Sequence, residues 1–252
     1  MKLRVLGCSG TEAKGFSPTS FIIDRTLLVD AGAVCSALNL EEQHAIRHVL
    51  ITHSHLDHVR GVPLLADNLN LARMPHSIEI VSIPQVLEIL KTHILNNLVW
   101  PDFSRIPSQD RPVLTYRDIT EEIEFQAGDF HITAFASSHS VPSVGYRIAH
   151  EGKTLVFSGD TGPTDRLWHH VGNADALIVD VSFPDSMEWL ARLSGHLTPG
   201  LLAREMTKCT SLPTHMYITH IKPQFLEQVQ TELMALNMGN LEILQDGAEI
   251  EI

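Results

Sequence analysis

A short segment in the first quarter of the chain concentrates side chains that bind metal ions. The segment HSHLDH places His53, His55, Asp57 and His58 within six residues. Residues two apart in an extended loop face the same side, so His53 and His55 can share one ion while Asp57 and His58 turn to another side. Neutral imidazoles and a carboxylate suit zinc, iron or manganese. The pattern therefore predicts a site for two metal ions, rather than a polar loop that is crowded with histidine by chance.

A short buried strand is expected to carry this segment. Residues 48–51, HVLI, form a largely apolar run with β-branched side chains, which predicts a strand. The metal-binding segment then follows the end of that strand. Ligands of α/β proteins commonly bind at this position.

The HSHLDH segment resembles the HxHxDH signature of the metallo-β-lactamase fold hydrolases. Three further residues follow strand-like segments, in the order and approximate spacing of the later metal motifs of that family: His139, Asp160 and His220. Alone, His139 could be a surface residue and Asp160 a turn residue, but their repeated placement at strand ends argues against coincidence. The resemblance implies two groups of ligands bridged by one carboxylate. One group would be His53, His55 and His139, the other Asp57, His58 and His220, with Asp160 as the bridge.

Two divalent ions about 3.5 to 4 Å apart can share a water, lower its pKa and supply a hydroxide near neutral pH. By resemblance, Asp57 and Asp160 would serve catalysis, and His196 in the segment GHLTP would assist without binding metal. A capping or loop role is the alternative for His196. Asp30, which follows the strand expected at 26–29, is either a turn former or a partner that orients a metal-bound histidine. The resemblance favours the second role.

The irregular segment 95–112 narrows the resemblance. THILNNLVWPDFS is similar to the stretch around an aromatic–proline pair in the class II cyclic nucleotide phosphodiesterases, and HSHLDHVRGVPLL also fits that group. This implies hydrolysis of cyclic AMP or cyclic GMP to nucleoside 5′-monophosphates. The candidate substrate contacts are Asn97, Trp100, Phe103 and Lys222. Trp100 and Phe103 could instead only anchor the segment on the core.

Other activities remain open within the same fold. The tRNA 3′-end processing endonucleases share the motif and the extra histidine, and further relatives cleave lactones, thioesters or sulfate esters. Diiron redox relatives typically replace the second histidine of the motif by glutamate, but this chain has His55 there. Non-catalytic relatives usually lack one or more ligands, and none is missing here.

Charge and composition limit the classes of partner. The formal net charge of −12 argues against a protein that wraps nucleic acid, because phosphate contacts need clustered lysine and arginine. No apolar run approaches the roughly 18 residues that span a bilayer, and the first residues do not read as a signal peptide. We therefore expect a cytoplasmic protein with a small-molecule substrate and no membrane partner. The three cysteines are expected to be free thiols, and a homodimer is possible.

The remaining pattern predicts one domain over residues 1–252. Each half is rich in strands and then helical, which predicts two packed sheets with helices outside, the four-layer αββα sandwich of the α/β class that the resemblance also implies. Strands are expected at 2–6, 20–23, 26–29, 48–51, 78–82, 144–150, 154–158, 176–181 and 216–218, with hairpins at 119–138 and 241–252. Helices are expected at 62–71, 84–94 and 223–236, with another that starts at Thr198 and Pro199.

Overall fold

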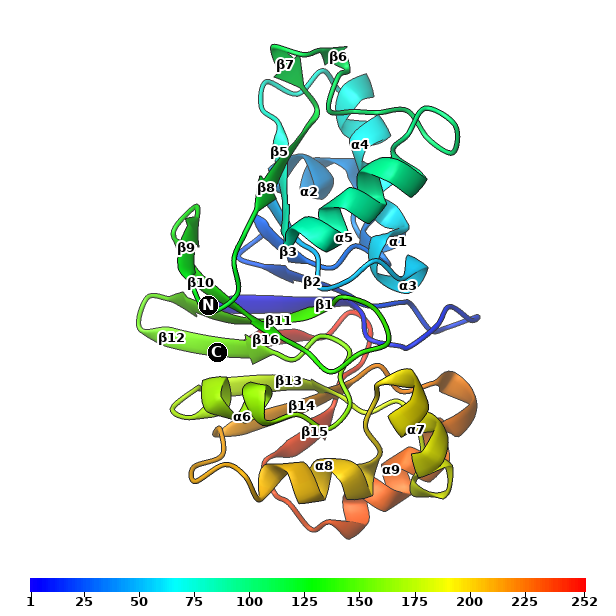
Figure 1. Ribbon diagram of the computed structural model, residues 1–252, viewed down its shortest axis with the longest axis vertical. Helices are drawn as coiled ribbons and strands as arrows, with labels where there is room; N and C mark the ends of the chain where they lie inside the picture. The colour runs from blue at the N-terminus through cyan, green and yellow to red at the C-terminus, as the bar shows by residue number, and fades with distance from the viewer.

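The structure is a computed structural model that describes residues 1–252. Two seven-stranded sheets pack against each other in the middle, and helices cover the outer face of each sheet (Figure 1). This arrangement confirms the predicted four-layer αββα sandwich. None of the helices combines the length and apolar character that crossing a bilayer requires.

The first sheet contains the strands of the N-terminal half and the last strand of the chain. Four neighbouring strands, β3, β4, β5 and β8, run parallel, so the loops that follow them leave the sheet at the same edge. In spatial order the strands are β16 (Glu249–Glu251), β1 (Lys2–Gly7), β2 (Ser20–Ile23), β3 (Leu27–Val29), β4 (His48–Leu50), β5 (Ile78–Ser82) and β8 (Leu114–Asp118).

The second sheet is formed by the C-terminal half. Its strands β12, β13, β14 and β15 are parallel, and their following loops also share one edge. In spatial order the strands are β15 (Leu241–Ile243), β14 (His215–Thr219), β13 (Ala176–Asp180), β12 (Lys153–Phe157), β11 (Val144–His150), β10 (Phe130–Ala136) and β9 (Glu124–Ala127). A separate two-stranded ribbon contains β6 (Pro107–Ser108) and β7 (Arg111–Pro112).

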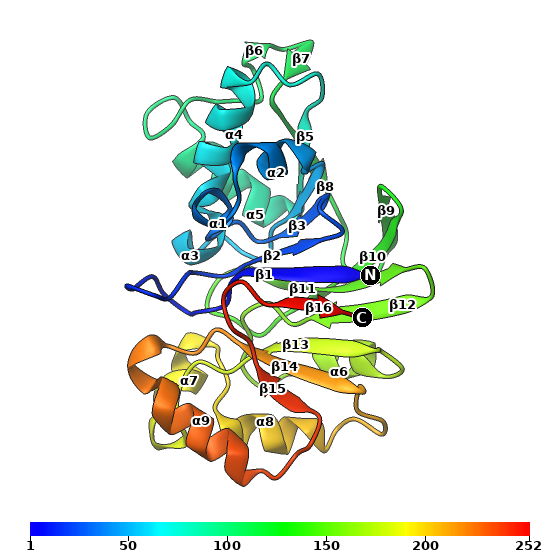
Figure 2. The same cartoon turned by 180° about the vertical axis from the view of Figure 1, so that it is seen from behind.

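The helices form the two outer layers (Figures 1 and 2). Those over the first sheet are α1 (Val34–Ala37), α2 (Leu40–Ala45), α3 (Leu56–Val59), α4 (Gly61–Leu71) and α5 (Pro84–Ile89), which continues as a π-helical turn over Leu90–Ile94. Those over the second sheet are α6 (Asp165–Val171), α7 (Glu188–Ser194), α8 (Pro199–Met206) and α9 (Leu226–Ala235), with 3₁₀ turns at Asp185–Met187 and Pro223–Phe225.

Burial explains why the central strands read as apolar runs. All five residues of β13 are buried, as expected for a parallel strand covered on both faces. The sheets are also joined by a polar contact across the core. The Tyr146 hydroxyl donates to the carbonyl of Ile51 at 2.8 Å, so the loop after β4 is anchored to the second sheet.

Most predicted elements are confirmed, but the C-terminal hairpin is wrong. Strand β15 pairs with β14 in the second sheet, whereas β16 pairs with β1 in the first. The chain crosses between the sheets at Gly247 and Ala248, which exchange backbone hydrogen bonds with Val5. The predicted 119–138 hairpin is shorter than expected. It consists of β9 and β10, residues 124–136, with the turn at Gly128. Helices α1, α2, α3, α6 and α7 were not predicted, because seven residues or fewer give little periodicity. Leu56–Val59 was expected to belong to an extended loop and is instead the helix α3, and strand β8 was also missed.

Candidate metal centre

Loops from both sheets meet at one edge of the sandwich. The segment after β4 begins helix α3, and the loops after β10, β12 and β14 supply His139, Asp160 and His220. Parallel strands deliver the β4, β12 and β14 loops to this edge, and β10 runs so that its end arrives beside them. The structure therefore brings together the residues that the sequence separates by up to 167 positions, from His53 to His220.

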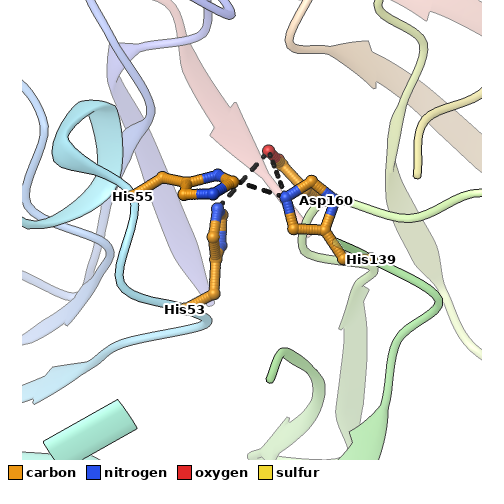
Figure 3. Close-up of side chains that lie close together, drawn as sticks. All are labelled: His53, His55, His139 and Asp160. Atoms are coloured by element: carbon orange, nitrogen blue, oxygen red, sulfur yellow. Dashed lines mark hydrogen bonds and ion pairs between the residues drawn. The ribbon is translucent and has the colours of Figure 1, made fainter. Parts of the chain in front are cut away.

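The first cluster contains His53, His55, His139 and Asp160. Their side chains point toward one another from three segments of the chain (Figure 3), and one ligand atom of each lies within 4.8 Å of those of the others. His139 Nε2 is 3.2 Å from His55 Nδ1, and His53 Nε2 is 3.6 Å from Asp160 Oδ2. This is a set of nitrogen and oxygen donors that suits zinc, manganese or iron.

The second cluster contains Asp57, His58 and His220, whose ligand atoms also lie within 4.8 Å of one another. His58 Nε2 is 3.3 Å from His220 Nε2, and Asp57 Oδ2 is 3.4 Å from the same His220 nitrogen. Asp160 Oδ2 lies 3.2 Å from His220 and 3.4 Å from His58. One carboxylate oxygen of Asp160 thus lies between the two clusters.

The unpaired polar atoms at this site fit bound cations. His53 is fully buried, and its Nε2 has no hydrogen-bond partner. In two places a pair of ring nitrogens face each other, His55 with His139 and His58 with His220. Buried polar atoms are normally satisfied, and a cation between facing lone pairs would satisfy them. The residues present therefore fit two divalent ions.

Asp30 lies behind the second cluster and orients His58. Its Oδ2 accepts from His58 Nδ1 at 2.7 Å and from the Thr52 hydroxyl at 2.8 Å, while Oδ1 accepts from the Thr52 backbone N–H at 2.9 Å. Such contacts fix the tautomer of a ligand histidine and leave Nε2 facing the metal position. The second of the two roles predicted for Asp30 is thus the one that its contacts favour.

His196 is held by a carboxylate that the sequence reading left without a function. Asp180 Oδ2 accepts from His196 Nδ1 at 2.8 Å, and the hydroxyl of Ser182 lies 3.2 Å from the same nitrogen. The His196 ring stacks on that of His220, with centroids 5.2 Å apart. A third group of four side chains also brings one ligand atom of each within 4.8 Å of those of the others. These residues are Asp160, Asp180, His196 and His220. Because Asp180 and His196 already pair with each other, this third group does not need a metal ion.

Opposing effects set the charges in the site. Burial raises the pKa of Asp160, but the imidazoles of His220, His58 and His53 outweigh it and hold that pKa well below the ordinary value. Burial lowers the pKa of His53 well below the ordinary value and also lowers the pKa of His139. Burial lowers the pKa of His58, but Asp160 and Asp30 raise it above the ordinary value, so the anionic Asp160 favours positive charge at its position. Divalent cations bind to such a carboxylate together with neutral imidazoles, and their binding releases the protons that the ligands carry.

His196 behaves differently from the imidazoles of the first cluster. Burial lowers its pKa, but the attraction and hydrogen bond of Asp180 outweigh burial, so the pKa lies above the ordinary value. Asp180 therefore favours the imidazolium form of His196. His196 is the group best suited to donate a proton at this site.

Of the four candidate substrate contacts, only Lys222 lies at the site. It follows His220 by two residues, and its ammonium donates to the carbonyl of Gly10. The Cα of Gly10 lies against the His220 ring. Phe103 is 2% exposed and packs within the core of the first half, with Trp100 packed against that core. The Asn97 side chain accepts from the Asp102 backbone. The loop that holds these three residues lies above α5 and beside α4 in both views, at the end of the first half away from α3 (Figures 1 and 2).

The sequence reading missed the groups that hold the ligands in place. Asp180 and Ser182 at the end of β13 orient His196 and His220, and Ser182 Oγ is 2.8 Å from His220 Nδ1. The Gly195 carbonyl accepts from His139 Nδ1 at 2.9 Å. The polar pair DVS directly after the apolar run of β13 was the available signal for Asp180 and Ser182. No side-chain signal could have identified the Gly195 carbonyl.

Comparisons with known proteins agree with this geometry. The model of the family described as the beta-lactamase superfamily domain matches residues 25–221. A probable 3′,5′-cyclic-nucleotide phosphodiesterase of Yersinia pestis is 26% identical over 79% of this chain, which spans 64% of that relative. Ribonuclease Z of Haloferax volcanii is 22% identical, with 100% of this chain and 95% of that protein aligned. A metallo-beta-lactamase fold protein from Bacillus subtilis has a TM-score of 0.81 at 20% identity, with 99% of both chains covered.

Proposed function

The chain belongs to the beta-lactamase superfamily as a hydrolase of the metallo-β-lactamase fold, and we propose that it hydrolyses 3′,5′-cyclic nucleotides to nucleoside 5′-monophosphates. The observation that carries this proposal is the position of the Asp160 carboxylate between two imidazole clusters, with His196, which is hydrogen-bonded to Asp180, stacked beside them on His220. The clusters can hold cations that bind a phosphate. His196 can protonate a leaving oxygen. The similarity to the Yersinia pestis protein supports the choice of substrate.

The residues of the two clusters would hold two ions of zinc, manganese or iron. Bound divalent ions generate a nucleophile from water near neutral pH and neutralise phosphoryl oxygens. His53, His55 and His139 would hold one ion and Asp57, His58 and His220 the other, and Asp160 would serve both.

The chain's own contribution to the reaction is proton donation at a fixed place. Asp180 engages His196 Nδ1, which leaves Nε2 free to face the substrate. As the bond between phosphorus and the 3′ oxygen breaks, the proton on Nε2 passes to that oxygen and yields the 3′ hydroxyl. The Lys222 ammonium, close to the site, favours binding of the anionic phosphate.

The test is product analysis. Purified protein with manganese or zinc is incubated with 3′,5′-cyclic AMP, and the products are separated by chromatography. We expect 5′-AMP from the wild type and from His131→Ala, a control at an exposed histidine of β10, but little from His196→Ala. If cyclic AMP and cyclic GMP stay intact while a chromogenic phosphodiester is cleaved, the proposed substrate is wrong although a hydrolytic site remains.

A second candidate is cleavage of RNA at the 3′ end of tRNA precursors. The full-length alignment with Haloferax volcanii ribonuclease Z favours it. The net charge of −12 argues against it, because RNA binding relies on clustered basic residues. A precursor tRNA with a 3′ trailer, assayed beside cyclic AMP, separates the two activities.

A further inference from the structure

A large groove lies on the second half of the molecule, outside the metal clusters. Its volume is about 990 Å³, and none of the seven candidate metal ligands lines it. Helix α9 forms one wall, and β15 with the residues after it forms the other. Figure 2 shows both elements on the same face of the molecule. Phe16 also lines the groove. The groove is large enough to hold a small molecule or a short peptide.

The β15 wall presents the edge of a sheet. β15 is the last strand of the second sheet and pairs only with β14. The six consecutive residues from Leu241 to Asp246 all line the groove. The first three of these residues form β15, and successive side chains of a strand point to opposite faces, so a cavity that meets all three faces the backbone edge of the strand. An unpaired edge of this kind can accept a further strand.

The α9 wall presents one side of a helix. Leu226, Gln230, Leu233 and Met234 line the groove at helical spacing, and all but Gln230 are apolar. Asn237 lines the groove just beyond the end of the helix. Met234 is 71% exposed, so its side chain is open to a ligand in the groove. A helix stripe opposite a strand edge is the arrangement in which domains bind extended peptides by strand addition.

The charge of the groove indicates what kind of peptide fits. Glu242 and Asp246 line it, and no lysine, arginine or histidine does. Asp246 is already bound to the backbone N–H groups of Cys8 and Ser17, but Glu242 has no side-chain partner. A peptide with a carboxylate at this place would be repelled, whereas a basic side chain would pair with Glu242.

We propose that the groove between α9 and β15 binds an extended peptide with alternating apolar and basic side chains, which adds to β15 as an eighth strand of the sheet. A second copy of this chain is a poor occupant. Pairing of two β15 edges would bring Glu242 close to its equivalent and join two chains of net charge −12. The site is independent of the proposed phosphodiesterase activity.

The binding test uses a fluorescein-labelled, acetylated (Lys-Val)4 amide and fluorescence polarisation. The comparison peptides are (Glu-Val)4 and (Lys-Val)4 with alternate backbone nitrogens methylated. Methylation removes the donors that pair with a strand edge and keeps the charges. We expect both comparison peptides to bind at least about tenfold more weakly, a difference of about 1.4 kcal/mol.

Variants of the two walls test the location. Glu242→Lys and Met234→Asp should each weaken (Lys-Val)4 binding at least about tenfold. Glu227→Lys, a charge reversal on α9 outside the groove, should leave it unchanged, and equal melting temperatures show that all three variants fold. Equal binding of the methylated peptide, or no effect of Glu242→Lys, would overturn the proposal. A dimer in sedimentation that Met234→Asp dissociates would assign the groove to a second copy instead.

Discussion

Replacing Asp30 by asparagine tests how the second metal cluster is held in place. The change preserves the shape of the side chain and replaces one carboxylate oxygen by an NH₂ group. The Thr52 backbone N–H donates to one oxygen of Asp30, while His58 Nδ1 and the Thr52 hydroxyl share the other. Asparagine must therefore place its NH₂ group either against the Thr52 N–H or against His58 Nδ1 and the Thr52 hydroxyl.

Either orientation of the asparagine has a cost. If the NH₂ group faces His58, the imidazole must carry its proton on Nε2, the nitrogen 3.4 Å from Asp160, and it loses the lone pair that would bind metal. If the NH₂ group faces the Thr52 N–H, two buried donors oppose each other at a cost of about 1 to 3 kcal/mol. Loss of such an orienting partner typically lowers metal affinity about 10- to 100-fold, or about 1.4 to 2.7 kcal/mol.

The assay is competition for zinc against a chromophoric chelator, with the free energy of unfolding measured in parallel without metal. The control is Glu205→Gln, because Glu205 is also a buried carboxylate that accepts from a backbone N–H and a side chain, those of Thr164 and Trp168. We expect both variants to lose stability, and only Asp30→Asn to lose affinity for one of two ions. Zinc affinity unchanged in Asp30→Asn would refute the role of Asp30 in orienting His58.

Three other predictions follow from the same geometry. His196→Ala should lower kcat about 100- to 10,000-fold, the usual contribution of a proton donor, without changing the metal content measured by mass spectrometry. Asp180→Asn removes the charge that raises the pKa of His196 and leaves burial to lower it. Since the donor must be protonated, the alkaline limb of the kcat–pH profile should then move to lower pH, and an unmoved limb would exclude His196 as the donor. Phe103→Ala should lower the free energy of unfolding by about 3 to 5 kcal/mol, because Phe103 is buried. The change should leave KM for cyclic AMP unchanged. A raised KM would instead place the loop of Phe103 at the substrate.

The layered fold was predictable because its buried strands are simple. In β13 every residue is buried, and a run of apolar residues bounded by polar ones is the pattern that such a strand produces. The C-terminal end was not predictable in the same way. Residues 241–252 contain two short strands joined by a turn, the pattern of a hairpin, but each finds its partner in a different sheet. Nothing local in a sequence specifies a partner more than 200 positions away.

The candidate ligands could be found because each follows a strand in a recurring order. The residues around them could not be found in this way. Asp180 and Ser182 act only because β13 lies between β12 and β14, which puts them beside His196 and His220. For Trp100 the sequence left two roles open, a wall for a nucleotide and an anchor of its loop on the core. Its position against the core of the first half favours the anchor.

Two residues of the site, Asp30 and His220, adopt a backbone conformation that their residue types do not indicate. Asp30 and His220 follow parallel strands and have φ values of 55° and 68°, in the left-handed region that favours glycine. Such conformations cost about 1 to 3 kcal/mol in residues with a side chain and persist only where the surroundings enforce them. Here the Asp30 N–H donates to the Leu50 carbonyl and the His220 N–H to that of Cys8. In this conformation the Asp30 side chain contacts Thr52 and His58, and that of His220 faces Asp57 and Asp160. Glycine would relieve the strain at both positions but would remove the carboxylate or the imidazole, so the residue types there reflect chemistry and not the ease of the turn.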